Sequence, residues 1–252
     1  MSNTDFIKPI NSKSTVEHIV NELINTIING IWKPGSKIPT EVELAEAFGV
    51  GRNSVREAIK VLVALGLLTI KRSDGTYVAN KFSEKMLNPL IYSFALDEGT
   101  NQQLADLKKI FHLGSTELAI HNATDKDILL LEESYQTFRN LLLTESSSPD
   151  ILLNADIDFH NTISQITHNV FVSRISYVIE RIGRTQRLHD MEYVISIHEI
   201  PFLIDSHFAI LQTIKNRDID KVREVVLHSF KYSKMSFEEN DTNGDQQSTT
   251  KS

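Results

Sequence analysis

The sequence of 252 residues contains no cysteine. It can therefore form no disulfide bond and no thiolate metal site, a composition that suits a reducing cytosol. Any metal ion that the chain binds must be held by histidine, aspartate or glutamate side chains, and nine histidines are available for this purpose.

Long apolar runs and an export signal are also missing. No segment approaches the roughly 20 consecutive apolar residues that a membrane-spanning helix requires. The N-terminal segment MSNTDFIKPINSKS lacks the basic start, apolar stretch and cleavage site of a signal peptide. We therefore expect a cytoplasmic protein with no membrane segment. Its length suffices for two domains, each with a core of its own.

Basic residues are in the minority, and they are unevenly distributed. The formal net charge of -7 argues against indiscriminate binding of nucleic acid. Residues 1–80 nevertheless carry nine basic and eight acidic side chains, whereas residues 81–252 carry 17 and 25. Within residues 50–72 a single glutamate accompanies five basic side chains, Arg52, Arg56, Lys60, Lys71 and Arg72. The chain thus holds one compact basic patch in an otherwise acidic molecule.

The first 80 residues have the signals of three helices followed by a β-hairpin. Capping boxes of the form Ser/Thr-x-x-Glu open the first two helices. Apolar residues then recur at helical spacing over residues 52–65, and two short β-prone segments flank a turn that contains Gly75. The capping boxes are Ser14–Glu17 and Thr40–Glu43, and the predicted strands are 67–70 and 76–79. This order is typical of a winged helix-turn-helix, in which the second helix of the pair enters the major groove of DNA.

The first turn of the third predicted helix carries side chains that can read bases. Arginine donates two parallel hydrogen bonds to guanine, asparagine suits adenine, and serine suits phosphate oxygens. The candidate DNA-binding residues are Arg52, Asn53, Ser54, Arg56, Lys71, Arg72 and Gly75. A solvated helix face with surface ion pairs is the alternative interpretation of Arg52 and Arg56. The capping boxes, the basic turn and the glycine-tipped hairpin, in that order, favour DNA binding.

These residues also carry a resemblance to a known family. The segment KIPTEVELAEAFGVGRNSVREAI, from residue 37, together with Gly66-Leu-Leu and Asp74-Gly-Thr-Tyr-Val, is similar to the DNA-binding domain of the GntR family of bacterial regulators. The resemblance implies that the start of the third helix and the wing read the operator. Two positions depart from the family: Val42 replaces an arginine, and Gly51 replaces a serine or threonine that would cap the helix.

The chain beyond residue 86 is predicted to be helical, because leucine and isoleucine recur there at intervals of three and four residues. One continuous helix is expected over residues 170–195. The fold class is therefore mainly α. The predicted domains are a winged helix-turn-helix over 10–80, a linker over 81–86, an all-α antiparallel helical bundle for effector binding and dimerisation over 87–237, and a disordered tail over 238–252.

Asp156 and His160 lie four residues apart, so their side chains share one helix face, where both can hold one ion. Such pairs also arise by chance, and a simple hydrogen bond is the alternative interpretation. His207 and His228 lie among apolar residues of the last two predicted helices, where an unpaired imidazole is costly. One shared ion would satisfy all three histidines. The other histidines, His112 among them, are assigned to the surface or to packing.

This second half resembles the FCD effector domain that one large GntR subfamily carries. The resemblance rests on Asp156-Ile-Asp-Phe-His160, Thr167-His-Asn169, the segment that begins at His207, and His228. It implies a divalent metal, often zinc or nickel, bound by the aspartate and the three histidines, with a small carboxylate effector completing the coordination shell. The interval from His207 to His228 is one residue short, and Lys108-Lys-Ile-Phe-His112 stands where Arg-x-x-Leu-Glu is usual.

The candidate residues for holding an anionic effector are Lys108, Asn169 and Arg184. Arg184 is one of three arginines at three-residue spacing, with Arg181 and Arg187, so only one or two of them can face the interior. A solvated basic face is the alternative.

The expected function is that of a transcriptional repressor that small metabolites release from DNA. One reading head contacts only a few base pairs, so we expect a homodimer on a palindromic operator. Two other functions stay open. One is the same regulator with a metal-free pocket for an acyl or other apolar ligand. The other, more distant, is a metal-dependent hydrolase, although no general base stands out in the sequence.

Overall fold

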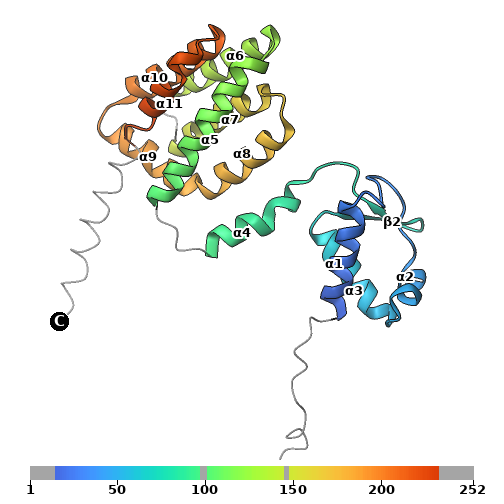
Figure 1. Ribbon diagram of the computed structural model, residues 1–252. Coiled ribbons are helices and arrows are strands. Elements are labelled where there is room, and N and C mark those ends of the chain that lie inside the picture. Colours follow the sequence, from blue (N-terminus) through green and yellow to red (C-terminus); the bar gives the residue numbers. More distant parts are fainter. Residues whose placement is uncertain (1–14, 97–100, 145–147, 233–252) are drawn as a thin grey trace, which may run out of the picture. The chain divides into compact units, whose positions relative to one another are not determined.

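The computed structural model describes residues 15–96, 101–144 and 148–232. The chain divides into two compact units, Met1–Leu90 and Ile91–Ser252 (Figure 1). Ser14, which opens the first predicted capping box, and the predicted tail over 238–252 lie outside the described residues. In the described part, no helix is long and apolar enough to cross a membrane.

Over residues 15–78, the first unit contains three helices and a two-stranded sheet. Its elements are α1 Thr15–Ile28, α2 Glu41–Phe48, α3 Arg52–Ala64, β1 Leu68–Lys71 and β2 Gly75–Val78. Helix α1 packs on α3, and Ile19, Leu23, Val55 and Leu62 are almost completely buried between these helices and their neighbours. The strands are antiparallel, with Lys71 opposite Gly75. The predicted winged helix-turn-helix is thus confirmed.

Local signals place α2 and the turn after it. The Thr40 side chain accepts a hydrogen bond from the Glu43 backbone, and the Glu43 carboxylate accepts one from the Thr40 backbone N–H, 2.7 Å away. Gly49 ends the helix at φ 65°, a left-handed conformation that glycine adopts without a steric penalty. This glycine lets the chain turn directly into α3.

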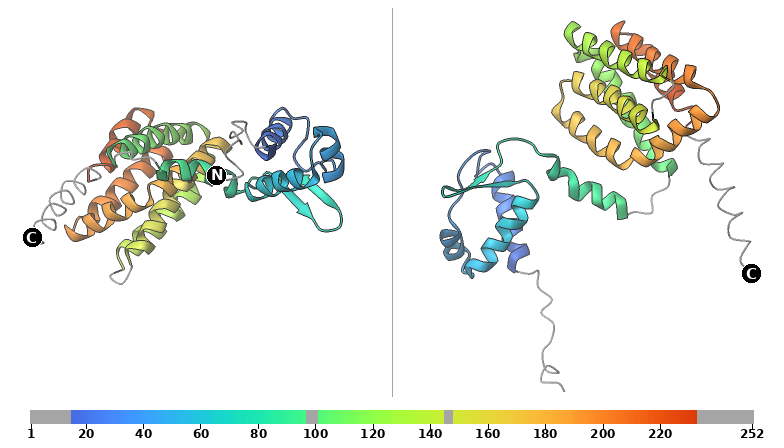
Figure 2. Two further views of the ribbon diagram at one scale, coloured as in Figure 1. Left: turned by 90° about the horizontal axis from the view of Figure 1, so that it is seen from below. Right: turned by 180° about the vertical axis from the view of Figure 1, so that it is seen from behind.

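The described chain is helical from Glu84 onward (Figure 2). The elements are the 3-10 helix η1 Glu84–Leu87, α4 Asn88–Leu96, α5 Asn101–Asn122, α6 Asp125–Leu142, α7 Pro149–Ile166, α8 Val170–Ile182, α9 Arg184–Ser196, α10 Ile200–Lys215, the 3-10 helix η2 Ile219–Lys221, and α11 Val222–Ser229. This agrees with the predicted mainly α fold class.

Helix α7 lies at the centre of the second unit, where it packs against α5, α6, α8 and α9. Its apolar residues Leu153 and Phe159 are completely buried. Because α7 is enclosed by its neighbours, polar side chains at its centre are also removed from solvent. These side chains therefore need partners inside the bundle.

One predicted helix is divided in two. The expected continuous helix over 170–195 is α8 followed by α9, with Gly183 between them. A Cβ atom at this position would lie 2.3 Å from Cε of Lys108, so only glycine allows the α5 side chain to approach. Glu180 therefore lies on α8 and Arg187 on α9, and the two side chains form a hydrogen bond with each other.

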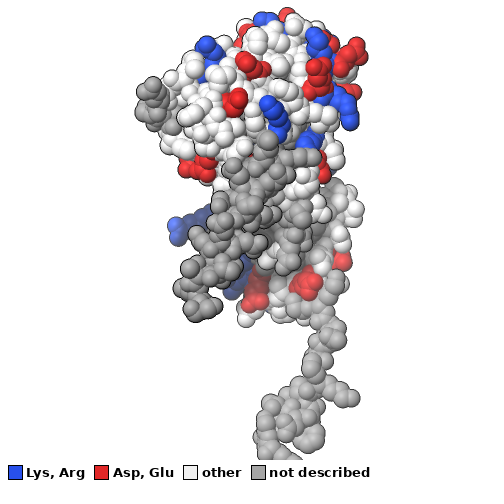
Figure 3. Space-filling model, turned by 90° about the vertical axis from the view of Figure 1, so that its left-hand side faces the viewer, with Lys and Arg blue, Asp and Glu red and all other residues white. Residues whose placement is uncertain are grey.

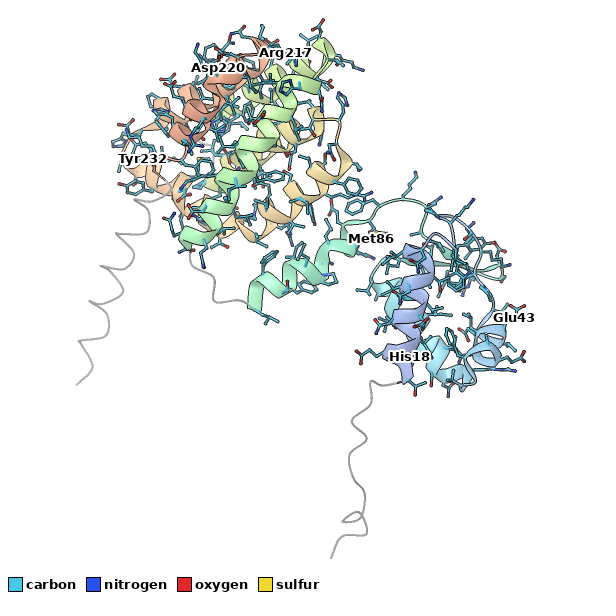
Figure 4. All side chains as sticks on the ribbon, viewed as in Figure 1. His18, Glu43, Met86, Arg217, Asp220 and Tyr232 are labelled. Atoms are coloured by element: carbon cyan, nitrogen blue, oxygen red, sulfur yellow. The ribbon has the colours of Figure 1, made fainter. Side chains whose placement is uncertain are left out.

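Arg217, labelled in Figure 4, joins the end of α10 to the end of α5. Its guanidinium donates hydrogen bonds to the backbone carbonyls of Ala119, Ile120 and Ala123. The Ile120 carbonyl lies in the last turn of α5 and the Ala123 carbonyl just beyond it, where helix carbonyls lack backbone donors, whereas the Ala119 carbonyl also accepts from the Ala123 N–H. The contact fixes α5, which supplies two side chains to the site described below.

Candidate DNA interface and candidate metal and effector site

The first turn of α3 presents polar side chains to solvent. Arg52 and Asn53 are exposed and Ser54 is half-buried, whereas Val55 is completely buried. The N-cap residue Gly51 makes no side-chain cap hydrogen bond, as its replacement of serine or threonine implies. The helix is therefore anchored by its apolar face and offers its basic first turn to a partner.

Arg56 is the one candidate on α3 for which an ion pair is described. Its Nε donates to Oε2 of Glu41, the first residue of α2, at 3.0 Å. The partner thus lies on a different helix, α2, and not on α3 itself. Both side chains are substantially exposed, so the pair contributes little to stability. It leaves both terminal amino groups of the guanidinium outside this ion pair.

The wing, which is the hairpin of β1 and β2, is held in place by Lys37, a residue that the sequence analysis did not select. Nζ of Lys37 lies 3.3 Å from Oδ1 of Asp74, and the Tyr77 hydroxyl donates to Oδ2 of the same carboxylate at 2.8 Å. Gly75 has a φ of 145°, a backbone conformation that side chains rarely allow, which explains the glycine. The basic residues Lys71 and Arg72 are exposed.

A metal-ligating group lies in the second unit. Within the described residues, Asp156 and His160 of α7 and His207 of α10 form the only group of three such side chains whose ligand atoms all lie within 4.8 Å of one another. The three residues are largely buried. Aspartate and imidazole ligands suit zinc and nickel, among other transition metals.

The two oxygens of Asp156 have different partners. Oδ1 lies 2.8 Å from Nε2 of His207 and 3.8 Å from Nε2 of His160. Oδ2 accepts a hydrogen bond from Nη1 of Arg187 at 2.6 Å. Burial opposes ionisation, but the charge of Arg187 and the hydrogen bond with His207 outweigh it and hold the pKa of Asp156 well below its usual range. The carboxylate is therefore ionised and fixed in orientation.

The hydrogen bonds of His207 fix its ring beside Asp156. Nδ1 lies 2.8 Å from the backbone carbonyl of Leu203, an acceptor, so this nitrogen carries a proton. Nε2 lies 2.8 Å from Oδ1 of Asp156. Nε2 either donates a proton to this oxygen or, when a metal ion is bound, directs its lone pair to the ion. The donor atoms of the group therefore fit a metal ion as well as a direct hydrogen bond.

The neighbouring imidazoles are held in the neutral form. Burial, followed by the nearby His112 and Arg187, holds the pKa of His160 well below its ordinary value. Burial also lowers the pKa of His112, although Glu180 opposes this shift. The rings of His112 and His160 lie 4.4 Å apart. Neutral imidazole is the form that binds metals.

A cavity of about 90 Å³ adjoins this group. Lys108 of α5 lines it and donates from Nζ to the carbonyl of Gly183 at 3.3 Å. Burial, together with repulsion from Arg187, lowers the pKa of Lys108 to about 8, so the side chain remains mainly cationic at neutral pH. On the face of the helical unit drawn in Figure 3, acidic and basic side chains are interspersed.

The structure corrects the placement of His228. This residue, on α11, is exposed, and its ring lies 5.1 Å from that of Phe202 rather than beside Asp156. Its neighbour Ser229 lines the cavity instead. Successive side chains of a helix point about 100° apart, so the interval that is one residue short turns the histidine away from the site.

Two of the effector-binding candidates also lie elsewhere. The side chain of Asn169 accepts hydrogen bonds from the backbone of Phe171 and Val172, so it caps the N-terminus of α8. Arg184 contacts Asn154 and Asp150 outside the cavity. Asn169 therefore acts as a helix cap, a role that the sequence interpretation did not weigh, and Arg184 fits the alternative of a solvated basic face.

Three side chains complete the buried site beyond the predicted ligands. Arg187 donates from Nη2 to Oε1 of Glu180 at 3.3 Å, and Nε2 of His112 lies 3.7 Å from the same oxygen. His112 was assigned to the surface or to packing, and Glu180 was not considered. No spacing in the sequence indicates Glu180, because its partners Arg187 and His112 lie on other helices, α9 and α5.

Comparisons with known proteins match both units. Residues 15–78 match the description "Bacterial regulatory proteins, gntR family", and residues 103–231, about half of the chain, match "FCD domain". The chain belongs to the GntR family, in the subfamily that carries an FCD domain. Members of the GntR family are DNA-binding transcriptional regulators, so this protein is a regulator and the hydrolase is excluded.

Named relatives are similar to this protein over most of its length. It is 24% identical over 215 residues to the galactonate operon transcriptional repressor of Escherichia coli, covering 84% of this chain and 91% of the relative. It is 27% identical over 228 residues to the Uxu operon regulator of Haemophilus influenzae, covering 86% and 82%. The solved structure of Streptococcus agalactiae GntR has a TM-score of 0.60 at 22% identity, covering 88% of this chain and 99% of that one, and supports the fold.

Proposed function

We propose that this GntR protein is a repressor whose affinity for its operator is controlled by a small carboxylate bound at a metal ion in the FCD domain. Asp156, His160 and His207 would hold the metal, with zinc or nickel as the expected ion. The observation that carries the proposal is the group of three side chains whose ligand atoms all lie within 4.8 Å of one another inside the helical bundle. A metal ion would take the place of the proton between Nε2 of His207 and Oδ1 of Asp156, which lie 2.8 Å apart.

The surroundings of the ligands support this assignment. The Leu203 carbonyl fixes the ring of His207 with its Nε2 lone pair toward the site, and Arg187 fixes Asp156. Such contacts behind the ligands are typical of metal centres. Three protein ligands leave at least one coordination position open, which a carboxylate from the effector can fill.

Lys108 is the cation that we assign to the effector's carboxylate. Arg187 also lines the cavity, but its guanidinium is engaged by Asp156 and Glu180. The Nζ group of Lys108 has one described hydrogen bond, to a backbone carbonyl, and an ammonium group has three donors. The galactonate operon named for one relative agrees with a carboxylate effector, because galactonate is a carboxylate.

In the first unit, the proposed DNA contacts are those of the first turn of α3 and the wing. Arg52, Asn53 and Arg56 would read bases in the major groove, and Ser54 would bind phosphate. Lys71, Arg72 and Gly75 would approach the backbone or the minor groove. Two copies of the chain would bind a palindrome whose half-sites are about 34–36 Å apart. This role places the protein in the cytoplasm, together with the DNA that it reads.

The metal site is tested by comparing two histidine variants of the full chain. Protein prepared without chelators is analysed by mass spectrometry for metals, and zinc binding is measured by calorimetry. We expect His207→Gln to lower zinc affinity by at least about 10-fold. His228→Gln, a matched control on an exposed position, should bind zinc as the natural protein does.

A natural protein that contains no metal and binds neither zinc nor nickel would contradict the metal site. The regulator with a metal-free pocket for an acyl or other apolar ligand would then be favoured. Equal loss of zinc affinity in both variants would contradict the assignment of the ligands.

A further inference from the structure

The cavity beside the proposed metal ligands is lined by two chemically different sets of side chains. We propose that its effector is a small carboxylate with an apolar body, and not a polyhydroxylated sugar acid. This inference rests on the proposed metal and effector site, and it specifies the class of molecule that the site takes.

One part of the cavity lining is polar, and the other part, called the apolar wall below, is apolar and aromatic. The polar part consists of the proposed metal ligands together with Lys108, His112, Arg187 and Asp190. The apolar wall consists of Met191, Val194, Phe202, Leu203, Phe230 and Tyr232. Within this wall the rings of Phe202 and Tyr232 lie edge to face, 4.7 Å apart. A bound carboxylate that points its charged group at Lys108 therefore directs the rest of the molecule toward apolar carbon.

The hydroxyl groups of the two serines that line the cavity are already used as donors. Oγ of Ser206 donates to the carbonyl of Leu203 at 3.1 Å, and Oγ of Ser229 donates to the carbonyl of Val226 at 2.8 Å. Each carbonyl belongs to the serine's own helical segment, so neither proton is available to a ligand. A sugar acid would have to bury several hydroxyl groups against a wall that leaves most of them unpaired, which is unfavourable.

The cavity is also small, about 90 Å³. The effector is therefore expected to carry only a few carbon atoms beyond its carboxylate.

A matched pair of ligands tests this inference. 2-Hydroxybutanoate and threonate share one carbon chain, one carboxylate and one hydroxyl next to it, so both can approach a metal in the same way. They differ in the two distal hydroxyls that threonate alone carries. Calorimetry of the zinc-loaded full chain should give an affinity for 2-hydroxybutanoate that is higher by about 100-fold.

A substitution on the apolar wall supplies a second measurement. Val194→Thr keeps the shape of the side chain and adds a hydroxyl at the cavity, so it should reduce the preference for 2-hydroxybutanoate over threonate. Val178→Thr is the control, because Val178 is equally buried, at 2% exposed, but does not line the cavity. Its ratio of the two affinities should equal that of the natural protein.

The outcomes separate this inference from the proposed function. Zinc binding with equal or tighter binding of threonate overturns the inference and leaves the metal site intact. Failure of the zinc-loaded protein to bind either ligand also overturns it. Failure to bind zinc overturns the metal site on which the inference rests.

Discussion

At the scale of single residues, Arg187 is the side chain that organises the buried site. Its guanidinium donates to Asp156 through one terminal nitrogen and to Glu180 through the other. Nη2 also lies 3.5 Å from Nε2 of His112. The side chain of Arg187 is only 11% exposed. We infer that Arg187 is a positioning residue, which fixes Asp156 with Oδ1 toward the two histidines.

The substitution Arg187→Lys tests this positioning role. Lysine keeps the charge but cannot donate to both carboxylates from a planar group. We expect zinc affinity to fall by about 10- to 100-fold, as is usual when a contact behind a metal ligand is lost. Arg184→Lys, on the same helix but outside the cavity, is the control and should leave zinc affinity unchanged. Equal affinities for all three proteins would refute the role, provided that circular dichroism shows them folded.

Arg52 is the residue to which we assign the most specific role in DNA recognition. We expect Arg52→Ala to weaken binding to a preferred duplex by about 1–3 kcal/mol and to relax preference at one base position. Lys60→Ala removes one exposed positive charge from the same helix, two turns further on. It should preserve base preference. If both variants lose affinity equally at every sequence, Arg52 acts only through its charge.

The sequence predicted part of this residue-level picture. The spacing of Asp156 and His160 is local, because both lie on one helix face whatever the fold. His207 was selected because it lies among apolar residues, and also through the resemblance, and it lies beside them. His228 was misplaced by one helical position, and Glu180 was missed, because its partners come from other helices. Contacts of that kind depend on packing, which spacing along the chain does not encode.

At the scale of secondary-structure elements, α6 begins with a capping box whose carboxylate has a second partner. The Thr124 side chain accepts from the Asp127 backbone, and the Asp127 carboxylate accepts from Thr124. The same carboxylate lies 2.7 Å from Nε2 of His168, which has a positive φ of 51°. Hydrogen bonds from Thr124, assisted by His168, lower the pKa of Asp127 to about 2.

This cap predicts a dependence of stability on pH. The pKa of Asp127 is lower in the folded chain than in the unfolded chain, so its contribution is present above about pH 4 and is lost as the pH falls through about 2. Thr124→Ala should lower the free energy of unfolding by about 1 kcal/mol near neutral pH. Urea denaturation measures both effects.

Thr137→Ala is the control for the cap. Thr137 lies within α6 and donates only to the carbonyl of Glu133, one turn back. Its replacement should change stability little, because alanine is the better helix former. A larger loss for Thr137→Ala than for Thr124→Ala would contradict the role of the cap.

The elements themselves were largely predictable, because each depends on periodicity and caps that lie close together in sequence. The capping box at Thr40, the glycine turn and the hairpin all lie where the sequence places them. The single helix expected over 170–195 was wrong, since Gly183 divides it. The requirement for glycine comes from Lys108 on α5, 75 residues away, and is not visible in local periodicity.

At the scale of the whole molecule, a sensing unit affects a reading unit only through a difference in binding free energy. The effector must favour one of two arrangements of the reading heads, and DNA must favour the other. The family and its two domains were recognisable from sequence because the DNA-reading motif is continuous. The effector was not, since its pocket is assembled from four helices, α5, α7, α9 and α10, and the segment around α11.

The most direct test of this account is the affinity of the zinc-loaded chain for its own preferred duplex, with and without bound ligand. The duplex is first selected from a random library, and binding is then followed by fluorescence anisotropy at fixed salt. With 2-hydroxybutanoate at a concentration that calorimetry shows to be saturating, the dissociation constant should rise by about 5- to 150-fold. The rise should be absent in His207→Gln. An unchanged dissociation constant for the natural protein, with its site filled, would contradict the control of DNA binding by this site.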